Sequence, residues 1–94
     1  MEKNKIAEIA GVVAEYYGVE LDLLKSPYRH HEIAKVRHVA IALCAAFNEK
    51  HLEIANWFNR ERSLVSYCSK QILNKKQCYP RFAEEIKEII RRIK

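Results

Sequence analysis

The chain has 94 residues, 49% of them hydrophobic, and a formal net charge of +5. This length suits one domain with one core, which we expect to span residues 1–94, and the hydrophobic fraction excludes an intrinsically disordered protein. Only two glycines and two prolines are available for turns, so the composition predicts an all-α fold. With no apolar run near the roughly 20 residues that cross a bilayer and no apolar signal segment, we expect no membrane partner and a cytoplasmic protein.

The first third of the chain predicts two helices and a loop. Apolar residues recur at helical spacing over residues 5–17, and Gly18 provides a natural helix stop. Residues 20–25 predict one or two further helical turns. Pro27 disfavours helical dihedral angles at the residue before it, so residues 26–31 are expected to form a loop.

A long helix is expected from about Glu32. Its later part, residues 39–47, is apolar on every side, so this helix must be central and buried. Arg37 and His38 precede the apolar part. We expect both side chains to reach the surface.

The second half of the chain predicts three more helices. A short helix covers residues 51–58, and a longer one follows almost at once. After a linker at residues 75–80, a last helix covers residues 81–94 with its isoleucines and one phenylalanine on one stripe. The polar side of this helix mixes acids with bases, so the stripe is expected to cover the core and not a membrane surface.

The positive charge is concentrated in two segments. Residues 25–38 and 59–76 together hold nine basic and two acidic residues, a net +7, whereas the remaining residues carry a net −2. This distribution suits a face that binds a polyanion. A basic helix face can also serve solubility alone, so charge by itself does not decide between the two.

The cysteines and histidines lack the pattern of a metal site. Cys44, Cys68 and Cys78 are odd in number without paired C-x-x-C spacing, and the four histidines lack zinc-ligand spacing. We therefore expect structural thiols in a reducing compartment, rather than a disulfide or zinc framework, and no cofactor. No nucleophile–base pair or carboxylate pair stands out from its spacing, so we expect a protein that is not an enzyme.

Residues 51–75 have the pattern of a helix-turn-helix. Ala55 is a small residue that lets two helices cross closely, and Asn59, four positions later, tolerates the left-handed turn conformation. With the apolar residues of the second helix facing inward, six side chains face outward: Glu61, Arg62, Ser63, Ser66, Tyr67 and Lys70. A recognition helix offers such an array to the DNA major groove. From this pattern alone, an αα-hairpin in a helical bundle remains an equal alternative.

A longer stretch, from Arg29 to Ile72, resembles the C-terminal DNA-binding domain of the bacterial replication initiator DnaA. It reads RHHEIAKVRHVAIALCAAFNEKHLEIANWFNRERSLVSYCSKQI. That family has a basic loop, an Arg-Gln pair that opens a buried helix, and a GGRDHTTV signature at the turn and recognition helix. Upstream, VAEYYGVELDLLKS matches the family's first helix and the short segment after it. The resemblance implies an all-α, Trp-repressor-like fold that binds duplex DNA.

The resemblance also implies roles for residues in the first basic segment. Arg29 stands where the family has the loop arginine that enters the minor groove. Arg37 and His38 stand at the Arg-Gln pair, with the arginine kept and the glutamine changed. Lys35 is a further basic residue expected to contact DNA.

In the signature, Arg60 and Val65 are kept, but one turn glycine is missing. Glu61 replaces aspartate, Arg62 replaces histidine, and the two threonines become serine and leucine. The frame of phosphate contacts is thus kept while most base-reading residues differ. The predicted DNA-binding residues are Arg29, Lys35, Arg37, His38, Arg60, Glu61, Arg62, Ser63, Ser66, Tyr67 and Lys70.

We expect sequence-specific binding of double-stranded DNA, of the type used at replication origins and DnaA boxes. The sequence has no GxxxxGK[ST] phosphate loop, so no nucleotide is expected to bind this chain. Two alternatives remain. One is a small transcriptional regulator of Trp-repressor-like architecture, and the other is a non-catalytic protein-interaction module whose basic face binds an acidic partner.

Overall fold

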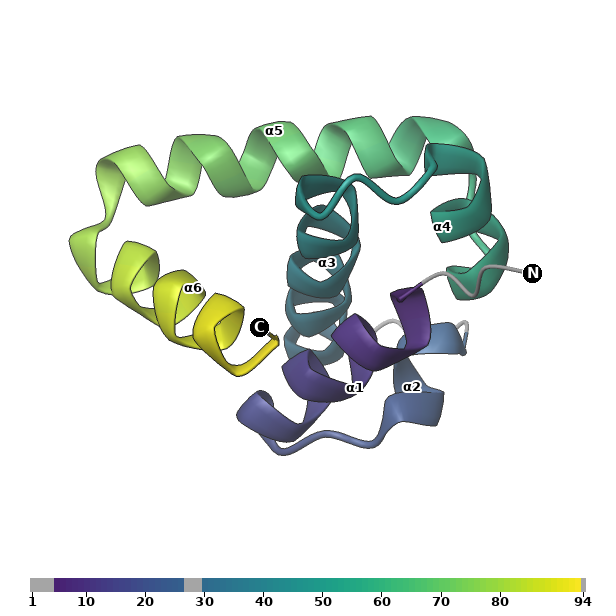
Figure 1. Cartoon of the computed structure of the whole chain (residues 1–94), viewed down its shortest axis with the longest axis horizontal. Coiled ribbons are helices and arrows are strands. Elements are labelled where there is room, and N and C mark those ends of the chain that lie inside the picture. Colours follow the sequence, from purple (N-terminus) through teal and green to yellow (C-terminus); the bar gives the residue numbers. More distant parts are fainter. Residues whose placement is uncertain (1–4, 27–29, 94) are drawn as a thin grey trace.

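The computed structural model describes residues 5–26 and 30–93, and this part of the chain contains six α-helices and no strand (Figure 1). The helices are α1 (Ile6–Tyr17), α2 (Leu21–Lys25), α3 (His31–Ala46), α4 (His51–Phe58), α5 (Arg62–Cys78) and α6 (Pro80–Ile93). The all-α prediction is confirmed. Within the described residues, no helix combines the length and the apolar character that a membrane span requires.

Helix α3 forms the centre of the molecule and packs against α1, α2, α4 and α5 (Figure 1). Six consecutive side chains, at residues 39–44, are all buried. Six successive residues point in every direction around a helix, so burial of all of them requires neighbours on every side. The prediction that this apolar helix is central is confirmed.

Helix α1 ends at the glycine that follows it, Gly18. Gly18 adopts φ +70°, and the next backbone N–H, that of Val19, donates to the Ala14 carbonyl at 2.9 Å. A glycine reaches this left-handed conformation without the steric cost of a Cβ. The first helix therefore stops at Gly18, as the sequence predicted.

Helix α6 covers the open side of the core, where it packs against α1 and α5 (Figure 1). Its residues Phe82, Ile86 and Ile89 are buried. The expectation that this stripe covers the core is confirmed.

The linker expected at residues 75–80 is mostly helical, and this boundary prediction was wrong. Helix α5 continues through Cys78, and α6 begins at Pro80, two residues later. Lysine and glutamine favour helix, and no glycine or proline interrupts the chain before Pro80. A proline is tolerated at the first helical position because its missing N–H would have no partner there. As a result, α5 extends three residues past the predicted helix-turn-helix, to Cys78.

Candidate nucleic-acid interface

The turn between α4 and α5 is built around Asn59. This residue adopts φ 57° and ψ 50°, the left-handed conformation expected from the sequence. The N–H of Arg60 donates to the Ala55 carbonyl at 2.8 Å, which closes the end of α4. Ala55 itself is buried, and the small side chain lets α4 and α5 pack closely. The two helices therefore form the predicted helix-turn-helix.

Helix α5 has a buried side and an exposed side. Val65 and Cys68 are fully buried, and Ile72 is partly buried against the core. Every side chain that was predicted to face outward is exposed: Glu61, Arg62, Ser63, Ser66, Tyr67 and Lys70. Their outward orientation is confirmed. We call these six residues the α5 face.

The side chain of Arg37 is buried and is not part of the protein surface. Its side chain is only 4% exposed, although the sequence analysis expected it to reach the surface and contact DNA. The guanidinium donates to the carbonyls of Leu24 at 2.8 Å, Leu23 at 3.0 Å and Ser26 at 3.2 Å. The last carbonyls of a helix have no partner within the helix, and an arginine beside them can provide the missing donors.

The expected exposure of Arg37 was therefore wrong, because the end of α2 lies against its guanidinium. Burial, and then the nearby charge of Arg60, lower the pKa of Arg37 below its ordinary value. An arginine nevertheless keeps its charge at any physiological pH. Arg37 thus supplies charged donors that hold α2 to α3.

Arg60 is partly buried and holds the turn in place. Its Nη1 donates to the carbonyls of Phe58 at 3.2 Å and Asn59 at 3.0 Å, and its Nη2 donates to the carbonyl of Ser26 at 2.6 Å. Arg37 and Arg60 therefore share the Ser26 carbonyl. This shared acceptor connects α3 and the helix-turn-helix to the segment that leaves α2. A backbone acceptor leaves no mark in the sequence, so this arrangement was not predicted.

His38 and Tyr67 connect α3 to the α5 face. Their rings meet edge to face with centroids 6.4 Å apart. Burial, followed by the charges of Arg37 and Arg60, lowers the pKa of His38 below its ordinary value. The imidazole is therefore mostly neutral at neutral pH. Lys35, one turn earlier on α3, is exposed.

Arg29, the residue assigned to the minor groove by resemblance, lies outside the described residues. The neighbouring described residue, His30, caps α3: its Nδ1 accepts a hydrogen bond from the Glu32 N–H at 3.3 Å. The predicted basic residues at the start of α3 thus divide into a buried arginine, a half-buried histidine and an exposed lysine.

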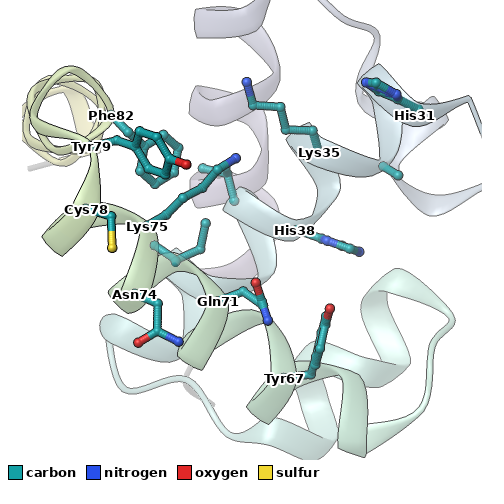
Figure 2. A pocket seen from close by; sticks show the side chains of 13 residues that line it. His31, Lys35, His38, Tyr67, Gln71, Asn74, Lys75, Cys78, Tyr79 and Phe82 are labelled. Carbon is teal, nitrogen blue, oxygen red and sulfur yellow. The ribbon is translucent and has the colours of Figure 1, made fainter.

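A groove of about 740 Å³ runs between α3, α5 and α6 (Figure 2). Three predicted DNA-binding residues, Lys35, His38 and Tyr67, line it. Lys75 and Tyr79 line its other end. Lys75 was counted in the second basic segment, but neither residue was predicted to bind DNA. They lie in the part of α5 and the junction that had been expected to be a linker, which is why they were missed.

The thiols behave as expected where they are buried. Burial raises the pKa of Cys44 to about 12, with a smaller contribution from Glu49, and raises that of Cys68 to about 11. Both are free and buried, whereas Cys78 is free and exposed. The described residues contain no group of three or more histidine, cysteine or acidic side chains that could hold a metal ion.

Comparison with known proteins supports the identification of α4 and α5 as a helix-turn-helix. The family model described as the bacterial DnaA protein helix-turn-helix matches residues 6–72, from α1 to the middle of α5. The chain is also 27% identical over 89 residues to the chromosomal replication initiator protein DnaA of Mycobacteroides abscessus. This alignment covers 94% of the chain and 18% of that relative. The chain therefore belongs to the bacterial DnaA helix-turn-helix family, a family of DNA-binding helical domains.

Proposed function

We propose that the chain binds double-stranded DNA sequence-specifically by placing the first turns of α5 in the major groove. The observation that carries this proposal is the two-sided character of α5. Val65 and Cys68 anchor the helix in the core, while the α5 face stays exposed from the turn onward. Recognition helices of this class contact base edges with their N-terminal residues, which here are the start of the α5 face.

Within that face we assign base reading to the first turn and phosphate contact to a later one. Arg62 presents a planar fork of donors that can pair with the O6 and N7 atoms of guanine, and Ser63 can donate to or accept from a base edge. Lys70, two turns further along, binds phosphate as a point charge. Lys35 provides a second cation from α3.

The two buried or partly buried arginines have a different task in this proposal. Arg37 and Arg60 position the helix-turn-helix relative to α2 and α3 through the Ser26 carbonyl, at 3.2 and 2.6 Å. Arg29 is assigned to the minor groove because of its place in the family's basic loop. Sequence specificity then comes from two sets of contacts: those of α5 in the major groove and those of Arg29 in the minor groove.

We propose further that the DNA site is of the DnaA-box type found at replication origins, with altered bases. Arg62 stands where the family has histidine, and Leu64 stands where it has threonine. An arginine favours guanine, and a leucine offers no hydrogen bond to a base. The preferred sequence should therefore differ from the family's box at the positions read by these two residues.

Selection from a random duplex pool tests the proposal directly. We expect a single enriched sequence bound by the wild-type chain, with an affinity that falls steeply as salt increases because counterions are released from the phosphates. Enrichment of no sequence, with uniform binding to all duplexes, would contradict sequence-specific recognition. The absence of any duplex binding at low salt would contradict the proposal as a whole.

A further inference from the structure

The groove between α3, α5 and α6 combines apolar side chains, among them Val39, Ile72 and Phe82, with cations and neutral hydrogen-bond donors (Figure 2). Lys35 projects from α3 and Lys75 from α5, and the tyrosine hydroxyl of Tyr79 lies at the junction to α6. Amide side chains of Gln71 and Asn74 complete the α5 side. All residues that line the groove belong to the described part of the chain, and none of them is acidic. The polar part of this lining suits an anion with several oxygen acceptors.

The lysines are free to bind such an anion. Lys35 and Lys75 are both exposed, and within the described residues neither forms a salt bridge with a carboxylate. The ammonium of Lys75 lies 5.1 Å from the centre of the Phe82 ring. A cation–π contact of this kind restrains a lysine while leaving most of its hydrogen-bonding capacity for a ligand. Lys75 is therefore held at the groove and has no anionic partner there.

The position of Lys75 along α5 indicates which anion this is. A helix rises about 1.5 Å per residue, so Lys75 lies about 18 Å beyond Ser63 along the axis. The major groove is about 12 Å wide and about 8.5 Å deep. When the N-terminal end of α5 enters that groove end-on, Lys75 lies outside it, where the anionic group that DNA presents is the phosphate backbone.

We propose that this groove binds the phosphate backbone of the same DNA duplex, beyond the bases that α5 reads. Lys35 and Lys75 would neutralise phosphates from opposite walls, and the hydroxyl and amide groups between them would donate hydrogen bonds. The proposal rests on the DNA binding proposed above and extends it from the α5 face to a second, sequence-independent site. The chain would then contact DNA that flanks its recognised sequence.

Cys78 provides a natural reporter because it lines the same groove and is exposed. The other two thiols are buried, with pKa values raised to about 12 for Cys44 and about 11 for Cys68, so an alkylating reagent at neutral pH reacts with Cys78 first. Iodoacetamide labelling of Cys78 would be followed by mass spectrometry on the unmodified wild-type chain. Three duplexes would be compared at saturation. One carries the selected site with minimal flanks, and the other two carry the same site extended by about one helical turn, roughly 10 base pairs, on one side or on the other.

We expect one of the two extended duplexes to slow Cys78 labelling severalfold, while the minimal duplex leaves it unchanged. The same extension should raise the affinity, whatever its base sequence, because a phosphate contact does not depend on the base. Labelling at equal rates with all duplexes would overturn the proposal. Protection by one flank sequence only would also overturn it, because it would indicate base reading in place of phosphate binding.

A matched pair of variants tests the lysine itself. Lys75→Gln should lower the slope of log affinity against log salt by about one unit on the extended duplex and leave it unchanged on the minimal duplex. Lys76→Gln removes the same charge from the next residue, which lines a separate groove with Ile86 and Ile90. It should change neither slope.

The outcomes separate this proposal from the broader one. Equal effects of the two variants on both duplexes would show a general charge effect and overturn the groove assignment, while specific binding of the minimal duplex would still support the α5 face. Failure of the wild-type chain to bind any duplex would overturn both. Circular dichroism of each variant, which should match the wild type, confirms that the comparison is made between folded proteins.

Discussion

The first turns of α3 and of α5 are both basic, yet the structure uses their arginines in different ways. Arg37 in α3 is 4% exposed and donates to three carbonyls at the end of α2. Arg62 at the start of α5 is exposed, and so is Ser63 beside it. The same residue type therefore stabilises the fold in one helix and remains available for a ligand in the other.

The difference comes from what lies opposite each helix. Helix α2 ends against α3, where the Leu24 carbonyl accepts from Arg37 Nε at 2.8 Å and the Leu23 carbonyl accepts from Arg37 as well as from Ser26. The start of α5 follows the turn at Asn59, so its outer side faces solvent. Nε and Nη2 of Arg37 are thus taken up by acceptors inside the fold, whereas the side chain of Arg62 is exposed.

The largest expected effect is the loss of stability in Arg37→Gln. The shorter, neutral side chain leaves the buried Leu24 carbonyl without its donor and removes one charged donor each from the carbonyls of Leu23 and Ser26. This loss should lower the free energy of unfolding by roughly 2–4 kcal/mol. Urea denaturation followed by circular dichroism measures this change. Arg62→Gln serves as the matched control and should change the stability by less than about 0.5 kcal/mol. Equal stabilities of the two variants would remove the contrast between the helices.

Arg62→Ala tests whether the exposed arginine at the start of α5 reads a base. The fold should remain intact, while the affinity for the preferred site falls by roughly 1–3 kcal/mol because a bidentate contact to guanine is lost. Repeated site selection should show a relaxed preference at one base position. If the variant selected the same sequence as the wild type, Arg62 would not be a base-reading residue.

Lys70→Ala should have a smaller and uniform effect. If Lys70 binds phosphate as proposed, specific and random duplexes should lose affinity alike, and the salt slope should fall by about one unit. Fluorescence anisotropy over a salt series measures both quantities. A change in the selected base sequence would instead assign Lys70 to reading.

The smallest expected effect is a pH dependence that comes from His38. Its pKa is lowered in the folded state, chiefly by burial, so the unfolded chain binds a proton there at a higher pH than the folded chain does. Stability should therefore decrease as the pH falls through about 6.5, the ordinary histidine value, until the folded-state pKa is passed. Urea denaturation at several pH values measures this trend.

His38→Gln, which restores the glutamine of the family, should make that decrease shallower. His51→Gln removes an exposed histidine from the start of α4 and should leave the wild-type pH dependence in place. A His38→Gln profile that overlays the wild-type profile would show that His38 does not contribute to it.

Several features followed from the sequence alone because they depend on local chemistry. The apolar run at residues 39–47 predicted a central helix, and residues 39–44 are all buried. Gly18 and Asn59 predicted the helix ends, since few residues adopt left-handed dihedral angles at low cost. The buried and exposed sides of α5 followed from the spacing of Val65 and Cys68.

The tertiary structure decided what depends on contacts between distant segments. The fate of Arg37 was set by backbone carbonyls 11 to 14 residues earlier, which carry no side-chain signal. The full length of α5 and the packing of α6 brought Lys75 opposite Lys35, although the two residues lie far apart in the chain. Residue spacing reports the faces of one helix, whereas the pairing of groups across helices depends on how the helices pack, and that is determined by the whole core at once.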